Sequence, residues 1–339
     1  MGKRSMSRTI TVSPIPLCLK YIMVVKGKHR TADGAHIAYE LHGEHLLGQP
    51  GKTPFVLIMG LSGVMPMWYP FAPALAQTRP VLIFDHRGIG LSTIPDEYDI
   101  FDLTFDTMVD DALSLVASFE WAKGGKPVHF LGYSMGGHIL MHLLTRQDGR
   151  YDEKAGVYSI KDVTISKAIL AATMTKLPRG DFKPAQVQEI MSQHEDKEKR
   201  DFAVTEYMID MQYYPEWISA NPANKKIRDD RIALSLSTKP SQTTVMAQAQ
   251  AIGAVDVRPH LHRIPAPSFP VLILHGKRDR MVDFSETAHT RKGIPGAETL
   301  FLDEVGHFWY DMNGGPGYWV REVGEWLDRP AAGEKRARL

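Results

Sequence analysis

The stretch Val-His-Phe-Leu-Gly-Tyr-Ser-Met-Gly-Gly at residues 128–137 decides the fold, because it joins a buried strand to a helix through a tight turn. Its first four residues form a short apolar block, typical of strands that are covered on both faces. A turn this tight forces Ser134 into a strained conformation that projects its hydroxyl, while Gly132 and Gly136 avoid the collisions that any Cβ would cause there. The helix that follows points its N-terminal amides at this hydroxyl, which favours developing negative charge. The pattern therefore predicts a reactive serine at the carboxyl end of a strand.

Similar apolar blocks recur along the chain, at residues 55–59, 81–84, 168–170 and 271–274, and a further strand is expected at 298–302. Apolar residues with helical spacing lie between them, most clearly from Phe105 to Trp121. Strands that alternate with helices in this way indicate an open α/β sheet with helices on both faces. Ahead of this sheet, residues 21–25 and 36–41 alternate as in an antiparallel hairpin.

The alternation of strands and helices stops after Ala172. Residues from about 175 to 262 are rich in charge, Met and Gln with helical spacing, and prolines interrupt them. We therefore predict one α/β core, formed by residues 21–174 and 263–328, with a helical cap inserted at 175–262. Residues 1–20 are expected to be a poorly ordered basic leader, and residues 329–339 a charged tail.

Composition excludes several classes of protein. The 339 residues include 40 Lys and Arg against 39 Asp and Glu, so the chain lacks the basic field that binding to nucleic acid needs. No run approaches the roughly 18 to 20 consecutive apolar residues that span a bilayer, so no membrane span is predicted. Cys18 is the single cysteine, which excludes an internal disulfide framework or cysteine-based metal site and favours a reducing compartment. No cofactor or metal is expected.

The ends of the chain bear on its location. Ala337-Arg338-Leu339 is a small, basic, Leu tripeptide of the same type as the Ser-Lys-Leu peroxisomal address, so binding to the peroxisomal import receptor is expected, with the cytoplasm as the alternative. The basic start of the chain has the composition of a mitochondrial transit peptide. Pro14 and Pro16 would break the amphipathic helix that such peptides need, so a mitochondrial location is less favoured.

Candidate partners for Ser134 follow two later strands. A serine hydroxyl needs a base to become nucleophilic, and the base needs an orienting acid. His307 follows the strand expected at 298–302, and Asp279 follows the strand at 271–274. Both therefore fall at the carboxyl edge of the sheet, where open α/β folds bind their ligands.

An oxyanion hole is expected next to this serine. It requires the amide that follows the nucleophile and a second amide from the loop after an earlier strand. Met135 and Leu61 occupy these two positions, and Gly60 lets the backbone of the second loop turn inward.

Together these motifs resemble the α/β-hydrolase superfamily over roughly residues 20–328. The resemblance rests on Ile-Met-Gly-Leu at 58–61, on Asp-His-Arg-Gly-Ile-Gly-Leu-Ser at 85–92 and on Gly-Tyr-Ser-Met-Gly-Gly at 132–137. The pattern is similar to that of bacterial ester hydrolases and of many uncharacterised fungal members. Met59, where histidine is common, and His86, where asparagine is common, depart from it and leave substrate preference open.

The resemblance implies an α/β-hydrolase fold, a mostly parallel eight-stranded sheet with a helical cap. It also implies the roles of five residues: Ser134 as nucleophile, Asp279 as acid, His307 as base, and Leu61 with Met135 as oxyanion amides. The chain order of serine, aspartate and histidine is that of this superfamily.

Other motifs have simpler explanations. His138 and His142 stand four apart on a helix that is expected to pack against the sheet, so we expect core histidines and no metal site. The charged patch from His194 to Asp201 is expected to be a solvated helix face. An apolar and aromatic group in the insertion could line a substrate pocket, although the core of a helical cap is the simpler expectation: Met208, Met211, Tyr213, Tyr214 and Trp217.

The sequence thus predicts a serine esterase that cleaves an ester or thioester of a moderately lipophilic small molecule through an acyl-enzyme intermediate. Two alternatives stay open. One is acyl transfer with the same triad, and the other is ligand binding without catalysis by a protein of this fold.

Overall fold

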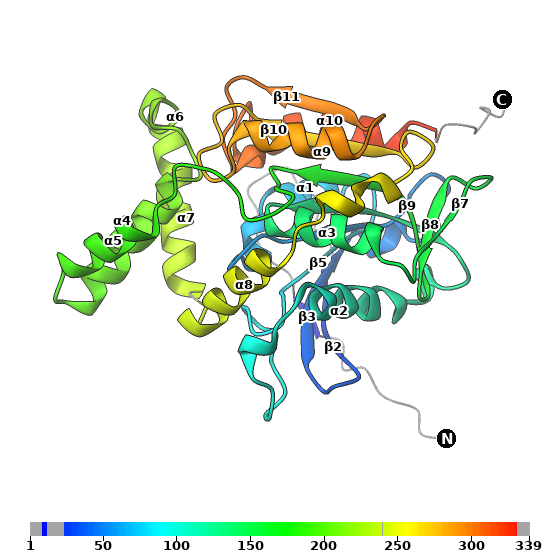
Figure 1. The fold of residues 1–339 in the computed structure, drawn as a ribbon, viewed down its shortest axis with the longest axis horizontal. Helices are drawn as coiled ribbons and strands as arrows, with labels where there is room; N and C mark the ends of the chain where they lie inside the picture. Colours follow the sequence, from blue (N-terminus) through cyan, green and yellow to red (C-terminus); the bar gives the residue numbers. More distant parts are fainter. Residues whose placement is uncertain (1–8, 12–23, 239, 331–339) are drawn as a thin grey trace.

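One sheet of eleven strands runs through the molecule (Figure 1) in the computed structural model, which describes residues 9–11, 24–238 and 240–330. The strands are β1 (Thr9–Thr11), β2 (Val24–Arg30), β3 (His36–His42), β4 (Phe55–Ile58), β5 (Val81–Phe84), β6 (Pro127–Tyr133), β7 (Arg150–Asp152), β8 (Val157–Ile160), β9 (Val163–Ala171), β10 (Val271–Gly276) and β11 (Glu298–Leu302).

The order of the strands is that of a mostly parallel sheet. The main path runs β1-β2-β3-β5-β4-β6-β9-β10-β11, and the pairs from β5 to β11 are all parallel. β2, β3 and β5 pair antiparallel. The eight strands from β2 to β11 on this path confirm the predicted sheet.

Two buried cores lie on opposite faces of the sheet. In β4, Val56 and Ile58 belong to one hydrophobic cluster and Phe55 and Leu57 to the other, as the two-residue period of a strand requires. The helices α2 (Phe105–Ala117) and α3 (Met135–Thr145) pack in the first cluster, and α1 (Phe71–Leu75) and α10 (Pro316–Asp328) pack in the second. A further helix, α9 (Thr287–Gly293), packs beside β10. Because both faces are covered, these strands are continuous apolar blocks.

The hairpin β7–β8 was not predicted from the sequence. The two strands pair antiparallel, and β8 extends the sheet beside the start of β9. Both are short, and β7 consists of Arg150, Tyr151 and Asp152, so no apolar block marks them. β9 itself begins at Val163, five residues before the predicted block at Ala168.

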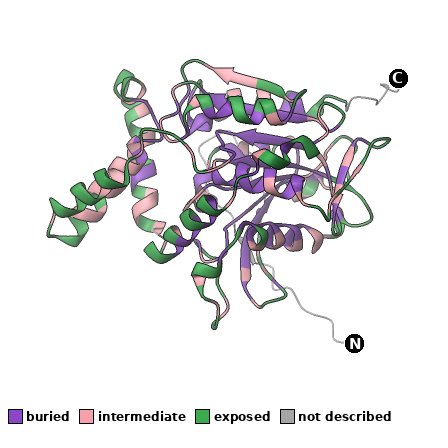
Figure 2. Ribbon diagram, viewed as in Figure 1, coloured by how far each residue is buried: buried purple, intermediate pink, exposed green. Residues whose placement is uncertain are grey.

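Five helices fill the chain between β9 and β10: α4 (Pro184–Ser192), α5 (Lys197–Asp210), α6 (Pro215–Ala220), α7 (Pro222–Thr238) and α8 (Gln242–Ala254). α5 packs against α4 and α7, and the pair α4–α5 projects away from the sheet at the left of Figure 1. Figure 2 shows that its residues are mostly exposed or half-buried. α8 returns to the sheet, where Ala247, Ala251 and Ile252 join the same hydrophobic cluster as α2 and α3.

The predictions for the chain ends fall mostly outside the described residues. Of residues 1–20 the structure describes Thr9–Thr11, which forms β1 against β2 and therefore departs from the expected lack of order. The predicted hairpin is shifted, because β2 begins at Val24. Ala337-Arg338-Leu339 lies outside the described part. Within the described ranges, no helix combines the length and the apolar character that crossing a bilayer requires.

Candidate active site

Ser134 lies in the sharp turn between β6 and α3. Its backbone has φ 54° and ψ −123°, in the left-handed half of conformational space that non-glycine residues rarely adopt. The turn is held by its neighbours, because the amide of Ser134 donates to the carbonyl of Ala171 at 2.9 Å and its carbonyl accepts from Thr173 Oγ1 at 2.6 Å. A strained serine held on several sides in this way is the arrangement of a nucleophile elbow.

The two glycines that flank the serine are required by close approaches of the backbone. A Cβ on Gly132 would lie 2.3 Å from the carbonyl oxygen of Gly136, and a Cβ on Gly136 would lie 2.2 Å from that of Ile58. Both distances are too short for real carbon atoms, and backbone atoms cannot rotate away. Ile58 ends β4, so the second contact sets the turn against the loop that carries Leu61.

His307 and Asp279 form a buried pair at the carboxyl edge of the sheet. Nδ1 of His307, in the loop after β11, lies 2.7 Å from Oδ2 of Asp279, just past β10. Oδ1 of Asp279 accepts the amides of Met281 and Val282, each at 2.9 Å. Burial alone would raise the pKa of Asp279, but His307 and His275 beside it bring that pKa well below its ordinary value. The carboxylate is thus ionised and orients the imidazole so that Nε2 is available.

Ser134 and His307 line one cavity of about 490 Å³ between the sheet and the helices α5, α7 and α8. Among the described residues no hydrogen bond joins Ser134 Oγ to His307. In the absence of substrate this contact is commonly long and tightens when substrate binds. The amides of His307 and Phe308 both donate to the carbonyl of Gln212, at 2.9 and 3.1 Å, so the end of α5 holds the histidine loop.

The predicted oxyanion residues flank the serine. Met135 is the first residue of α3, and Leu61 lines the same cavity. A Cβ on Gly60 would lie 3.0 Å from Cβ of Ser134, so the loop passes directly beside this serine. The backbone amides at a helix start lack partners within the helix, which leaves that of Met135 available.

Two residues to which the sequence analysis gave no supporting role hold this loop: His86, noted there only as a departure from the family pattern, and Gln248, which it did not name. Nε2 of His86 donates to the carbonyl of Met59 at 2.9 Å, and burial lowers the pKa of His86, so the ring is neutral. From α8, Oε1 of Gln248 accepts the amide of Ser62 at 2.8 Å. Ser62 has φ 60°, so this hydrogen bond holds a strained residue next to Leu61. Both contacts join side chain to backbone across distant parts of the chain, which no local pattern reveals.

The inner wall of the cavity is apolar and rich in methionine. Five methionines line it: Met59, Met67, Met191, Met208 and Met281. Of the five cap residues considered from the sequence, Met208 alone lines this cavity. The other four belong to the packing of the cap, as in the stack of Tyr213 on Trp217 with ring centres 4.7 Å apart. A deformable apolar wall of this kind accepts hydrophobic groups of varied shape.

A buried ion pair fastens the cap to the histidine loop. Arg231 on α7 forms a two-pronged contact with Asp311, four residues after His307, and Tyr213 also donates to that carboxylate at 2.7 Å. The guanidinium lies over the ring of Phe308, 5.4 Å from its centre. The cap and the histidine loop are therefore one packed unit.

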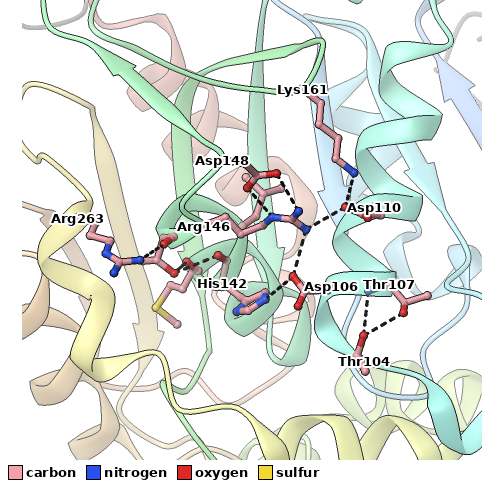
Figure 3. A network of polar contacts seen from close by, with 12 residues as sticks. Thr104, Asp106, Thr107, Asp110, His142, Arg146, Asp148, Lys161 and Arg263 are labelled. Atoms are coloured by element: carbon pink, nitrogen blue, oxygen red, sulfur yellow. Dashed lines mark hydrogen bonds and ion pairs between the residues drawn. The ribbon is translucent and has the colours of Figure 1, made fainter.

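The structure agrees with the core-histidine interpretation for His138, whereas His142 is half-buried at the surface and does not belong to the core. His138 is fully buried with its ring 4.7 Å from that of Phe105, and His142 lies 3.1 Å from Asp106 in the polar network of Figure 3. In this network Arg146 pairs with Asp106, Asp110 and Asp148 and ties α2 to the loop after α3. The described residues contain no group of His, Cys, Asp and Glu suited to a metal ion.

Comparison with known proteins places the chain in a family. A family model described as the alpha/beta hydrolase fold matches residues 53–313. "Putative carbamate hydrolase RutD" of Stutzerimonas stutzeri is 26% identical over 271 residues, 79% of this chain and 89% of that protein. The protein of the same name from Agrobacterium fabrum is 25% identical over 272 residues, 79% and 90% of the two chains.

Solved structures share the fold. An esterase from Exiguobacterium antarcticum superposes with a TM-score of 0.66 and 18% identity, over 89% of this chain and 99% of the esterase. An enol-lactonase from Burkholderia xenovorans gives 0.63 and 21%, over 87% and 97%. Since the family model spans well over half of the sequence, this protein belongs to the alpha/beta-hydrolase family.

Proposed function

We propose that the protein is a serine hydrolase that cleaves an ester or thioester of a moderately lipophilic small molecule through an acyl-enzyme. The observation that carries the proposal is that Ser134 lines the same cavity as His307, whose other ring nitrogen is held by the buried carboxylate of Asp279. Membership of a family of hydrolases supports it.

In the proposed reaction Nε2 of His307 accepts the hydroxyl proton of Ser134 while Oγ attacks the acyl carbon. The amides of Leu61 and Met135 donate to the oxyanion, and donors of this kind contribute roughly 3 to 4 kcal/mol each in the transition state. His307 then gives the proton to the leaving alcohol or thiol. A water molecule that is deprotonated by His307 attacks the acyl-serine and releases the acid.

The cavity supports an apolar substrate portion. Its methionines and Phe308 offer dispersion contacts to an alkyl or aryl group, and the hydrophobic contribution is about 0.8 kcal/mol for each buried methylene. We therefore expect kcat/KM to rise with acyl chain length until the cavity is filled.

A carbamate is the second candidate substrate, because relatives that align with most of this chain are named as carbamate hydrolases. The same serine would attack the carbamate carbon and form a carbamoyl-serine. A panel of p-nitrophenyl esters, acyl-CoA thioesters and p-nitrophenyl carbamates separates the candidates by their kcat/KM values. Adding alcohols or amines as acceptors tests acyl transfer in the same assay.

Covalent labelling tests the nucleophile. We expect a fluorophosphonate probe to label the folded protein on Ser134, and Ser134→Ala to abolish both labelling and hydrolysis. Ser219→Ala, which changes an exposed serine in α6, is the matched control and is expected to label like the wild type. Folded wild-type protein that fails to label would favour the non-catalytic alternative and contradict the proposal.

A further inference from the structure

The cavity that contains Ser134 has a charged outer part. Lys197, Arg200 and Asp201, all in the first turns of α5, line it together with the apolar residues described above. The sequence patch from His194 to Asp201 was expected to be a solvated helix face; Lys197 is exposed as expected, whereas Arg200 and Asp201 are half-buried against the cavity.

Arg200 differs from three other arginines, two in α7 of the cap and one in the loop after β10. Arg228, Arg231 and Arg280 each pair with a carboxylate. In the described part of the chain no hydrogen bond or ion pair engages the guanidinium of Arg200. Lys197 lies 2.7 Å from Asp201, so among the described residues that line this end of the cavity Arg200 is the cation without a carboxylate partner.

An apolar part of the cavity wall lies between Arg200 and the atoms proposed to react. Within α5, Asp210 at the end of the helix lies ten residues after Arg200, and Gln212 just beyond it holds the backbone of His307. Ten residues of helix correspond to about 15 Å along the axis. Met208 and Ile209, near the end of the helix that is close to His307, line the interval.

We propose that Arg200 binds an anionic group of the substrate, a carboxylate or a phosphate, at the end remote from the bond that is cleaved. A planar guanidinium presents paired N–H donors that match carboxylate and phosphate oxygens. The preferred substrate is then an amphiphile, with the scissile bond at Ser134, an apolar segment along the methionines and an anion at Arg200. This inference rests on the proposed function and names the class of substrate for that site.

Paired substrates test whether the anion that Arg200 binds is a carboxylate on the acyl group. The first series consists of p-nitrophenyl monoesters of straight-chain dicarboxylic acids, and the second of p-nitrophenyl esters of fatty acids with the same number of carbons. We expect the ratio of kcat/KM between the anionic and the neutral ester to peak at one chain length in the wild type. Arg200→Ala should lower this ratio about ten- to a hundredfold, the loss expected for one hydrogen-bonded charge pair, and Arg200→Lys should lower it less.

A second pair of substrates tests whether the anion that Arg200 binds is a phosphate on the leaving group. Acyl-CoA carries phosphates on its thiol portion, whereas the acyl thioester of pantetheine has the same reacting group without them. If the anion belongs to the leaving group, Arg200→Ala lowers the preference for acyl-CoA and leaves the two p-nitrophenyl series in their wild-type ratio. A dependence on Arg200 in either pair supports the proposal and tells which source supplies the anion.

Lys199→Ala is the matched control. Lys199 is one residue away on α5 and carries the same charge, but it is exposed and lies outside the cavity of Ser134. An equal fall of the ratio in both variants would indicate long-range attraction only and would overturn the assignment. So would an unchanged ratio in Arg200→Ala for both pairs of substrates. Absence of fluorophosphonate labelling and of all hydrolysis would instead overturn the proposed function and the role of Arg200 together.

Discussion

At the scale of single residues, the site depends on glycines that have no side chain as much as on the side chains of the candidate triad. Gly136 has no side chain to contribute, yet a Cβ there would meet the carbonyl group of Ile58 at the end of β4. The strain at Ser134 persists because the surrounding contacts leave the turn no other conformation.

We predict that Gly136→Ala disrupts the site. With a Cβ 2.2 Å from a backbone oxygen, either β4 or α3 must move, which should cost about 1 to 3 kcal/mol of unfolding free energy and most of the fluorophosphonate labelling rate. Gly253→Ala in α8 is the control, because a Cβ there meets nothing within 4 Å. In a helix this control should stabilise by up to about 1 kcal/mol. Chemical denaturation of both variants measures the unfolding free energy, and labelling kinetics measure the reactivity of Ser134. Normal labelling of Gly136→Ala would contradict the prediction.

At the scale of elements, much of the core could be predicted from sequence because its signals are local. An apolar block followed by Gly-Tyr-Ser-Met-Gly-Gly specifies β6, the turn and α3 within 18 residues, from Val128 to Thr145. The carboxyl ends of β10 and β11 likewise place Asp279 and His307. The hairpin β7–β8 has no such block, and nothing in the sequence around Gln248 indicates that it meets Ser62, 186 positions away.

The interpretation of α5 shows the same limit. A run of charged residues is normally a solvated face, and the spacing of Lys197, Arg200 and Asp201 gives no sign of a cavity. The cavity exists because α5 lies across from the Ser134 turn, which is a property of tertiary packing alone. Local sequence therefore predicts the candidate triad better than it predicts the other residues that line the cavity.

The contact between α8 and the oxyanion loop leads to a prediction about positioning. Gln248→Met keeps the length of the side chain but removes the acceptor for the amide of Ser62, so the loop that carries Leu61 should loosen. A displacement near 1 Å can cost about a hundredfold in rate, so we expect kcat to fall about ten- to a hundredfold with little change in KM. Gln250→Met, exposed on the same helix, is the control. A variant whose KM rises while kcat stays constant would indicate a role in substrate binding instead.

At the scale of the whole molecule, the cap is anchored beside the loop that carries His307. Arg231→Leu leaves Asp311 as a buried carboxylate without its cation, and breaking such pairs costs about 3 to 5 kcal/mol. We expect lower unfolding free energy and faster limited proteolysis in the cap, residues 175–262. Lys226→Leu on the same helix breaks an exposed pair with Asp230 and should cost at most about 1 kcal/mol. Equal losses in the two variants would contradict the anchoring role.

The response of the whole molecule to acid should depend on buried histidines. Burial, with a smaller contribution from His142, lowers the pKa of His138 to about 3, and burial also lowers those of His86 and His129. As pH falls below the ordinary value of 6.5, the unfolded chain takes up these protons before the folded one does. The folded state is therefore favoured fully above pH 6.5 and loses stability as pH falls below it; for His138 the loss is about 1.4 kcal/mol per pH unit until pH reaches about 3, and His86 and His129 add to it in the same direction.

We predict that His138→Leu makes unfolding less sensitive to acid. Neither ring nitrogen of His138 makes a hydrogen bond of good geometry with the described residues, so an apolar side chain loses little there. The slope of unfolding free energy against pH between 6 and 4 should decrease by about 1.4 kcal/mol per pH unit. The stability of the variant relative to the wild type therefore increases as pH falls. The same difference in stability at pH 8 and at pH 4 would contradict the prediction. Urea denaturation of both proteins across this pH range measures the difference in unfolding free energy. The contribution of carboxylates that also titrate in this range cancels in the difference, because both chains contain them.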